Sequence, residues 1–346
     1  MKTIIENYRN IPGQHCGSTA MRNLFYHYCD LELSEEVTFG LGSGIESIFI
    51  KSDTLDPAVS IFGRSITMEA DAAQSLGIDY REQPEMDNQK AWMDVRNEVL
   101  NGFPTMLTGD IFFLDHRNYK VRFPAHRFVL LGLDDQNESA FIADRVDPEP
   151  QICSYKAIAK SRNPDTGITT FNLWGKFFDT KVSNSLKEAA IQALKKNVDR
   201  MIGKDTSQME LLGATIDKNT VVATGIDGLK KFTDDLPGWL EREDGGKLAV
   251  YNAQCIEKFG TGGGNFRKMY ATFLNWANHL LPDMVSKSVI SLAEKSAESW
   301  TMLSDLLLTA SEEPGSKDVW KQASKKMAEI TDLETELFEK LSLKTG

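Results

Sequence analysis

A cysteine stands where an irregular segment of this chain gives way to a predicted helix. Cys16 lies in the run QHCGST at residues 14–19; apolar residues recur at helical spacing after it, and the preceding Pro12 and Gly13 cannot belong to a regular helix. In the first turn of a helix, unpaired N–H groups and the dipole favour a thiolate below the reference thiol pKa of about 8.5. Cys16 is therefore the candidate nucleophile, although an isolated cysteine at such a place is also a common small core residue.

A histidine and an aspartate at the ends of two predicted strands supply the other parts of a thiol catalyst. Residues 126–133 and 140–145 are rich in β-forming side chains and flank the turn-forming run DDQNES, so they predict an antiparallel hairpin. Pairing centred on Asp135 places His126 opposite Asp144, with Cβ atoms about 5 Å apart. A register slip of one residue would separate them. His126 then serves as the base and Asp144 orients it.

The other histidines near these elements compete for the role of base. His15 is adjacent to Cys16, and adjacent side chains at a helix start point apart. His27 lies about three turns further along the same predicted helix. His116 is the stronger competitor, but it falls in a predicted irregular loop rather than on a strand.

Stabilising a tetrahedral oxyanion requires hydrogen-bond donors beside the thiol. The backbone N–H of Cys16 is one donor. A second is the side-chain amide of either Gln14 or Asn10, which stands six residues before the cysteine. The residue types leave the choice between these two amides open.

Length and composition restrict the class of protein. The chain has 346 residues, of which 41% are hydrophobic and 26% charged, and this suits two globular domains. It has no run of about 18 apolar residues and no secretory signal pattern at its N-terminus, so we expect a cytoplasmic protein without a membrane span. The net charge of −11 argues against nucleic acid and anionic lipid as partners and suits a cationic substrate.

The four cysteines are spread widely over the chain. Cys16, Cys29, Cys153 and Cys255 form no Cys-x-x-Cys pair. This pattern predicts reduced thiols, no disulfide framework and no metal site.

The two halves of the chain differ in pattern. Residues 1–150 mix helical and strand-like segments separated by Gly and Pro, whereas residues 151–346 are mostly amphipathic at helical spacing. We therefore predict an α+β fold, with a catalytic domain over 1–150 and a mostly α-helical domain over 151–346. One helix of the second half begins with the capping-box pattern SLKE at residues 185–188.

Several segments together resemble a known family. Residues 13–20 (GQHCGSTA), 33–35 (LSE), 39–44 (FGLGSG) and 123–126 (FPAH) are similar to the N-terminal domain of the butirosin biosynthesis protein H family. Residues 260–270 (GTGGGNFRKMY) are similar to the helical domain of unknown function that usually follows it. The resemblance covers nearly the whole chain.

The resemblance implies a papain-like thiol acyltransferase of natural product and antibiotic biosynthesis. Such an enzyme takes an acyl or aminoacyl group from the phosphopantetheine thioester of an acyl carrier protein and passes it to a small amine through an acyl-enzyme on Cys16. The thioester is the donor substrate, and no bound cofactor is needed. In the more distantly similar peptidases that process bacteriocin leaders, a Gln lies six residues before the nucleophile, where this chain has Asn10.

A glycine-rich run in the second half is a weaker candidate site. Gly262, Gly263 and Gly264 lead into a helix predicted near Phe266, and N–H groups at such a start bind phosphate, here that of a pantetheine arm, with Arg267 adding charge. The run is not a P-loop, and a hinge or tight turn is the alternative interpretation. We also hypothesise that the helical domain acts as a lid or shapes the acceptor pocket.

Two other classes of function fit the same residues. A cysteine peptidase or amidase would use the same nucleophile and base but deliver the acyl group to water. A binding module for a carrier protein or a small molecule would keep the papain-like fold without catalysis.

Overall fold

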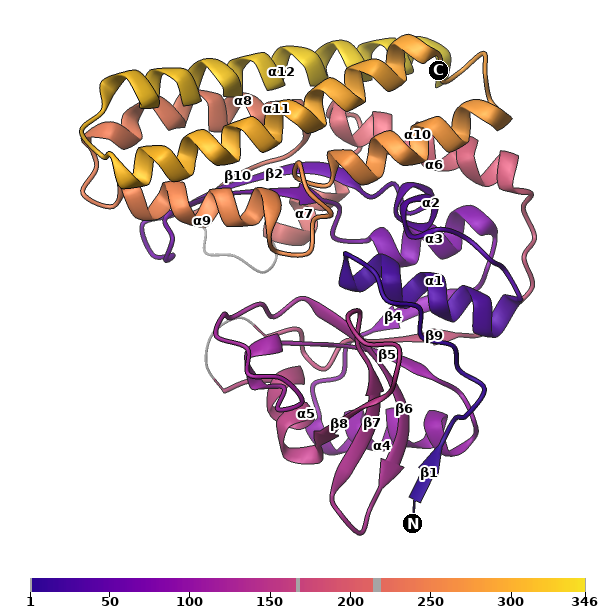
Figure 1. The fold of residues 1–346 in the computed structure, drawn as a ribbon. Coiled ribbons are helices and arrows are strands. Elements are labelled where there is room, and N and C mark those ends of the chain that lie inside the picture. Colours follow the sequence, from indigo (N-terminus) through magenta and orange to yellow (C-terminus); the bar gives the residue numbers. More distant parts are fainter. Residues whose placement is uncertain (1, 166–168, 214–218, 346) are drawn as a thin grey trace. The chain divides into compact units, whose positions relative to one another are not determined.

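The computed structural model describes residues 2–165, 169–213 and 219–345 (Figure 1). The chain divides into two compact units, each made of two separate segments. Unit 1 comprises Met1–Thr38 and Gly77–Ser183, and unit 2 comprises Phe39–Leu76 and Asn184–Gly346. The units therefore depart from the single boundary expected at residue 150.

Strand pairing explains why an early segment joins the second unit. In unit 2, β2 (Ile45–Lys51) pairs with β3 (Val59–Arg64) on one side and with β10 (Val221–Ala223) on the other, both antiparallel. Backbone hydrogen bonds to β10 thus hold β2 in the unit that contains the C-terminal helices.

A seven-stranded sheet forms the framework of unit 1 within the described residues. The strand order is β4-β9-β5-β6-β7-β8, with β1 also pairing with β6, and the pairs are antiparallel. The strands are β1 (Lys2–Ile4), β4 (Tyr80–Gln83), β5 (Thr105–Gly109), β6 (His126–Asp134), β7 (Ser139–Ala143), β8 (Gln151–Ser154) and β9 (Trp174–Phe177).

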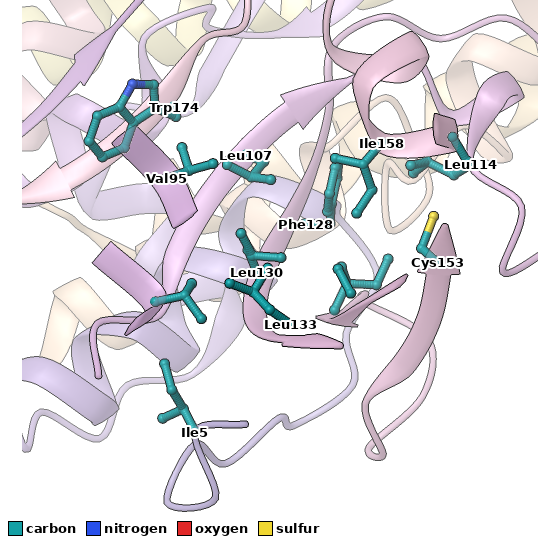
Figure 2. Packing of buried hydrophobic residues seen from close by; sticks show 14 residues of the cluster. Ile5, Val95, Leu107, Leu114, Phe128, Leu130, Leu133, Cys153, Ile158 and Trp174 are labelled. Carbon is teal, nitrogen blue, oxygen red and sulfur yellow. The ribbon is translucent and has the colours of Figure 1, made fainter. Parts of the chain in front are cut away.

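The helices of unit 1 surround this sheet. They are α1 (Cys16–Cys29), α4 (Asn88–Leu100) and α5 (Tyr155–Arg162), with a 3-10 turn η1 (Ile111–Phe113) and with α2 (Glu35–Leu41), which runs on into unit 2. Side chains of α4, α5 and the sheet share one hydrophobic core, including Val95, Leu107, Phe128, Ile158 and Trp174 (Figure 2). The strand β6 is buried along its whole length, so its ends are held firmly.

The predicted β6–β7 hairpin is present, but its register differs from the predicted one. Val129 was expected to face Phe141, and it pairs with Ala143 instead. His126 and Asp144 are therefore not directly opposed strand residues, because Asp144 lies just beyond the end of β7.

Two local features produce the shifted register. A four-residue loop, closed by the pair Asp134 and Ser139, connects the strands, and its last residue, Glu138, has a φ of 47°. A β-bulge also interrupts the pairing between Leu130 and Gly132. Both features depend on how the strands pack, so a turn centred on the acidic run could not reveal them.

Unit 2 is mostly helical, as expected. Helices α11 and α12 lie side by side and are joined by a short connection (Figure 1). The predicted capping box at Ser185 and Glu188 is confirmed at the start of α6. The helical elements are α3 (Met68–Leu76), α6 (Leu186–Met201), α7 (Ser207–Gly213), α8 (Gly225–Asp235), η2 (Leu236–Glu241), α9 (Gly245–Glu257), α10 (Arg267–Leu280), α11 (Lys287–Glu312) and α12 (Lys317–Thr345).

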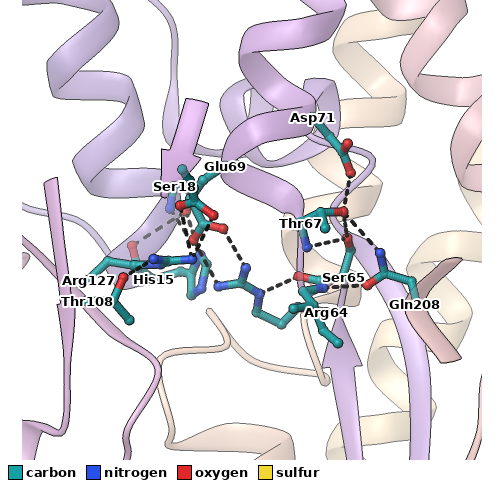
Figure 3. A network of polar contacts seen from close by, with 12 residues as sticks. His15, Ser18, Arg64, Ser65, Thr67, Glu69, Asp71, Thr108, Arg127 and Gln208 are labelled. Carbon is teal, nitrogen blue, oxygen red and sulfur yellow. Dashed lines mark hydrogen bonds and ion pairs between the residues drawn. The ribbon is translucent and has the colours of Figure 1, made fainter. Parts of the chain in front are cut away.

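Polar contacts hold β3, α3 and α6 together in unit 2, and Figure 3 shows those of Arg64, Thr67, Glu69 and Asp71. Arg64 donates to both carboxylate oxygens of Glu69, at 3.1 and 2.8 Å. The carboxylate of Asp71 accepts from the hydroxyl of Thr67 at 2.7 Å and from Arg200 at 2.8 Å. These contacts are internal to the unit and stabilise the packing of its short sheet on its helices.

The α+β class of the chain, with a sheet-containing N-terminal part and a mostly helical C-terminal part, is confirmed. In the ranges that the structure describes, none of the helices combines the length and apolar character needed to cross a membrane.

Candidate active site

The predicted helix start at Cys16 is confirmed. Helix α1 begins at Cys16, and His15 is its N-cap residue, with an extended backbone and a side-chain Nδ1 that accepts the N–H of Ser18 at 3.2 Å. Only 5% of the Cys16 surface is exposed. The cysteine therefore occupies the first helical turn and is enclosed by the protein.

Glu35, in the first turn of α2, holds the backbone that leads into α1. Its buried carboxylate accepts the N–H groups of Gln14 at 2.8 Å and His15 at 2.7 Å. The same carboxylate accepts the hydroxyls of Ser18 at 3.1 Å and Thr19 at 3.0 Å. These contacts fix the turn before the nucleophile, and they occupy two backbone N–H groups that an oxyanion could otherwise use.

The base and its orienting carboxylate lie in contact. The Nε2 atom of His126 is 3.1 Å from Oδ1 of Asp144, and both side chains are buried. The thiol of Cys16 lies near enough to His126 for the imidazole to lower the thiol pKa. Since Nε2 faces the carboxylate, Nδ1 is the nitrogen left for the thiol. The structure thus brings together the three residues that the sequence predicted, although the register argument behind one contact was wrong.

The environment of Cys16 favours its thiolate. Burial raises the pKa of the thiol, but hydrogen bonds and charge from His126 and His15 outweigh burial and hold the pKa well below its ordinary value. The sequence interpretation that His15 points away from Cys16 is therefore wrong. Imidazole contacts therefore lower the pKa of Cys16, and a contribution from the helix dipole stays a prediction.

The imidazole of His126 favours its protonated form. Burial lowers its pKa, while the charge of Asp144 and hydrogen bonds to Asp144 and Cys16 raise it to about 10. For Asp144, burial raises the pKa, but His126 and His116 hold it well below its ordinary value. The opposed pKa shifts of Cys16 and His126 favour a thiolate–imidazolium pair beside the Asp144 carboxylate.

The three remaining cysteines lie in the opposite electrostatic setting. Burial raises the pKa of Cys29 to about 11 and the pKa values of Cys153 and Cys255 to about 12. None of the four forms a disulfide. Cys16 alone among the four has a lowered pKa, which makes it the candidate nucleophile.

Asn10 does not supply the second oxyanion donor. Its Nδ2 donates to the backbone carbonyls of Asp144, at 2.9 Å, and Asp147, and its Oδ1 accepts from Asn23 at 2.8 Å. Both amide hydrogens are used, so the expectation for Asn10 is corrected: it ties the segment before Cys16 to the residues that follow β7. The side chain of Gln14 is exposed and stays the candidate donor.

The glycine-rich run does not form a phosphate site. The N–H of Gly263 donates to Thr261 at 3.0 Å, and that of Gly264 donates to the Glu257 carboxylate at 2.8 Å. Arg267 is 1% exposed and binds both oxygens of Glu334, at 2.8 and 2.7 Å. The expectation for Gly263, Gly264 and Arg267 is therefore wrong, because protein groups already occupy these donors, whereas for Gly262 it stays a prediction.

Two functional residues escaped sequence reasoning. Oδ2 of Asp144 is 2.9 Å from Nε2 of His116 and accepts the hydroxyl of Tyr119 at 3.2 Å. His116 was noted only as a rival base for Cys16. The only sequence signal is that both residues lie in the connection preceding His126, since no spacing rule predicts a second histidine on the same carboxylate.

Fold and site together define an α+β domain in which a helix-initial cysteine meets a histidine on a strand and an aspartate just beyond the next strand. Residues 15–145 match the family model of butirosin biosynthesis protein H, N-terminal, and residues 159–341 match a domain of unknown function (DUF4872). The chain therefore belongs to the butirosin biosynthesis protein H-like family, as its resemblance predicted. Membership indicates a biosynthetic enzyme. No curated protein matches the chain.

Proposed function

We propose that this protein is an acyltransferase that moves an acyl or aminoacyl group from an acyl-carrier-protein thioester to a small amine through an acyl-enzyme on Cys16. The observation that carries the proposal is the buried contact chain from the Cys16 thiol through His126 to Asp144. Membership in a family named for a butirosin biosynthesis protein supports a biosynthetic enzyme, and the carrier-bound donor and amine acceptor are what the resemblance implies.

In the first half-reaction, the Cys16 thiolate attacks the carbonyl carbon of the donor thioester. A carbon–sulfur bond forms, and the carbonyl electron pair moves to oxygen, where the N–H of Cys16 and the amide of Gln14 serve as donors. When that pair returns, the bond to the pantetheine sulfur breaks. The imidazolium of His126 gives its proton to the departing thiolate. Acyl-Cys16 and a neutral His126 remain.

In the second half-reaction, a neutral amine attacks acyl-Cys16. His126 takes a proton from the attacking nitrogen, and the Cys16 thiolate leaves with its bonding pair. A thioester and an amine are converted into an amide and a free pantetheine thiol, and the thiolate–imidazolium pair is restored. The pair must be a strong nucleophile in the first step and an effective base in the second, which its opposed pKa shifts allow.

Intact-mass analysis tests the first half-reaction. We expect the protein to gain the mass of one acyl group when mixed with an acyl-loaded carrier protein, and we expect no gain for Cys16→Ser. Adding a panel of primary amines, aminoglycosides included, should remove the acyl group and yield amides. A free acid as the only product would contradict transfer and indicate a cysteine hydrolase.

Thiol alkylation tests the activated state without any donor. Cys16 should react with iodoacetamide at pH values where the other three cysteines do not, because its pKa is lowered and theirs are raised. A Cys16 that titrates like an ordinary thiol would contradict catalysis and indicate a binding module.

A further inference from the structure

The carboxylate of Asp144 is bonded to two histidines. Its Oδ1 contacts Nε2 of His126 at 3.1 Å and accepts the backbone N–H of Arg145 at 2.6 Å. Its Oδ2 contacts Nε2 of His116 at 2.9 Å and accepts the hydroxyl of Tyr119 at 3.2 Å. A triad of nucleophile, base and orienting acid uses one imidazole on its carboxylate. The catalytic steps above therefore leave His116 without a role.

The surroundings of His116 indicate which of its ring nitrogens carries the hydrogen. Its side chain is 1% exposed, and its Nδ1 atom is buried with no hydrogen-bond partner in the part of the chain that the structure describes. A protonated ring would leave a charged N–H buried without an acceptor, which is unfavourable. The neutral ring with hydrogen on Nε2 avoids this. We infer that His116 donates one hydrogen bond, to Asp144.

Neighbouring residues place His116 independently of that hydrogen bond. Leu114 is 1% exposed and packs in the core of unit 1 (Figure 2). The carboxylate of Asp115 accepts the N–H of Ser154 at 3.0 Å and its hydroxyl at 2.6 Å, at the start of α5. The backbone directly before His116 is therefore held by the framework of the unit, and His116 can hold a partner in turn.

We propose that His116 is a positioning residue for the base: it holds Oδ2 of Asp144 so that Oδ1 faces His126, and it draws negative charge away from Oδ1. The role in transfer rests on the proposed function. Besides Asp144, the groups that face His126 are the thiol of Cys16 and the rings of Tyr119 and Phe128. Without the His116 donor, the carboxylate charge concentrates on Oδ1 and stabilises the His126 imidazolium. His126 then gives up its proton only at higher pH.

Two substitutions at this position separate hydrogen bonding from packing. His116→Leu removes the donor and keeps an apolar side chain, whereas His116→Gln returns an N–H at a similar reach. We expect His116→Leu to lower kcat for transfer at least tenfold with the donor KM unchanged. The pH midpoint at which His126 loses its proton should rise by about half a unit to one unit. His116→Gln should stay within about threefold of the wild type in kcat.

His27→Leu is the matched control, because His27 is a half-buried histidine in the last turn of α1, about 16 Å along the helix from Cys16. It should leave both kcat and the His126 midpoint unchanged. A His116→Gln variant as slow as His116→Leu would overturn the proposal. So would an unchanged His126 midpoint in His116→Leu, because a purely structural role lowers the melting temperature without moving that midpoint.

The midpoint is measured by NMR titration of the His126 ring in the full chain, which needs no acyl donor. If the wild type forms no acyl-enzyme, the proposed function fails by itself, and the titration still decides whether His116 controls His126. Should His116→Leu not fold, Tyr119→Phe removes the longer hydrogen bond to the same oxygen. That variant must raise the midpoint by a smaller amount, and an unchanged midpoint would overturn the proposal.

Discussion

Unit 2 buries an arginine against a glutamate, and unit 1 buries a thiol, two imidazoles and a carboxylate. In unit 2, Arg267 binds both oxygens of Glu334, and Glu334 also accepts the hydroxyl of Ser296 and the indole N–H of Trp300, each at 2.7 Å. A guanidinium does not lose its proton in proteins, so an ion pair of this kind is structural. This network joins α10, α11 and α12 without exchanging protons.

The buried groups of unit 1 differ because their protons can move. The pKa of Cys16 is lowered and that of His126 is raised to about 10, so a proton sits on the imidazole and is available to a leaving group. Burial of charge is common to both networks. The network of unit 1 is the candidate active site because two neighbouring groups, Cys16 and His126, have pKa values shifted in opposite directions.

Removing the nucleophile gives the largest difference between the two networks. Cys16→Ala should lower the transfer rate by about 10⁴-fold, or about 5.5 kcal/mol in activation free energy. Its free energy of unfolding should change by less than about 1 kcal/mol, because the thiol is small. Cys29→Ala, in the same helix but with a raised pKa, is the control and should transfer at the wild-type rate. Transfer by Cys16→Ala near the wild-type rate would contradict the proposal that Cys16 is the nucleophile.

Breaking the ion pair of unit 2 should change stability instead. Arg267→Met leaves the buried carboxylate of Glu334 without its partner and should lower the free energy of unfolding by about 3–5 kcal/mol. Urea denaturation followed by tryptophan fluorescence measures this. The adjacent Lys268→Met, at a side chain that is 47% exposed, should cost less than about 0.5 kcal/mol. The pH dependence of Cys16 alkylation should stay the same in folded Arg267→Met. A shifted pH dependence would contradict the claim that the ion pair of unit 2 does not influence the thiol of unit 1.

Neutralising the orienting carboxylate should change the pH behaviour of unit 1. The charge of Asp144 raises the pKa of His126 to about 10, so Asp144→Asn should lower that pKa and move the basic limb of the pH–rate profile to lower pH. A weaker imidazolium also stabilises the Cys16 thiolate less, so the acid limb should move up. We expect transfer at neutral pH to fall about 100-fold, or about 2.7 kcal/mol. A basic limb that stays near pH 10 would contradict this assignment.

Substitutions of Asn10 and Gln14, the two amides considered as oxyanion donors, should have smaller effects, one on stability and the other on the transfer rate. Asn10→Ala removes two hydrogen bonds to backbone carbonyls and should lower the free energy of unfolding by about 1–2 kcal/mol, with transfer per folded molecule within about threefold. Gln14→Ala removes an exposed amide and should leave stability unchanged while slowing transfer about tenfold. Melting curves and initial rates decide between them, and the reverse pattern would restore Asn10 as the donor.

The free energy of unfolding should also depend on the protonation of His126 in a defined pH range. The His126 pKa is about 10 in the folded protein and about 6.5 in an unfolded chain. The stabilisation from its protonation is therefore complete below pH 6.5 and is lost as the pH rises towards 10. Denaturation at pH 7 and pH 10 should show this loss, and it should be reduced in Asp144→Asn. An equal pH dependence in both proteins would show that other groups control it.

Features set by neighbouring residues were predictable from the sequence. Pro12 and Gly13 before an apolar helical repeat placed Cys16 at a helix start, and the SLKE run placed a capped start at Ser185. Each depends on hydrogen bonds within a few residues. The contact between His126 and Asp144 was also predicted, but the bulge and the four-residue loop were not, because they arise from the packing of the whole sheet.

Contacts between distant residues were not predictable in this way. Arg267 meets Glu334 across 67 positions, and this pairing turned an expected phosphate ligand into a buried structural residue. The division of the chain into units was not predictable for the same reason, since β10 holds β2 by strand pairing across a long sequence separation.

The sequence by itself determined the helix that begins at Cys16 and the strand that carries His126, since local hydrogen bonds and periodic burial specify them. Only the tertiary structure decided which side chains surround the charged atoms: Glu35 on the turn before Cys16, Asn10 on the carbonyl of Asp144, and His116 on its carboxylate. The physical reason is that burial makes each polar atom find a partner, and that partner can come from any part of the chain that packing brings near.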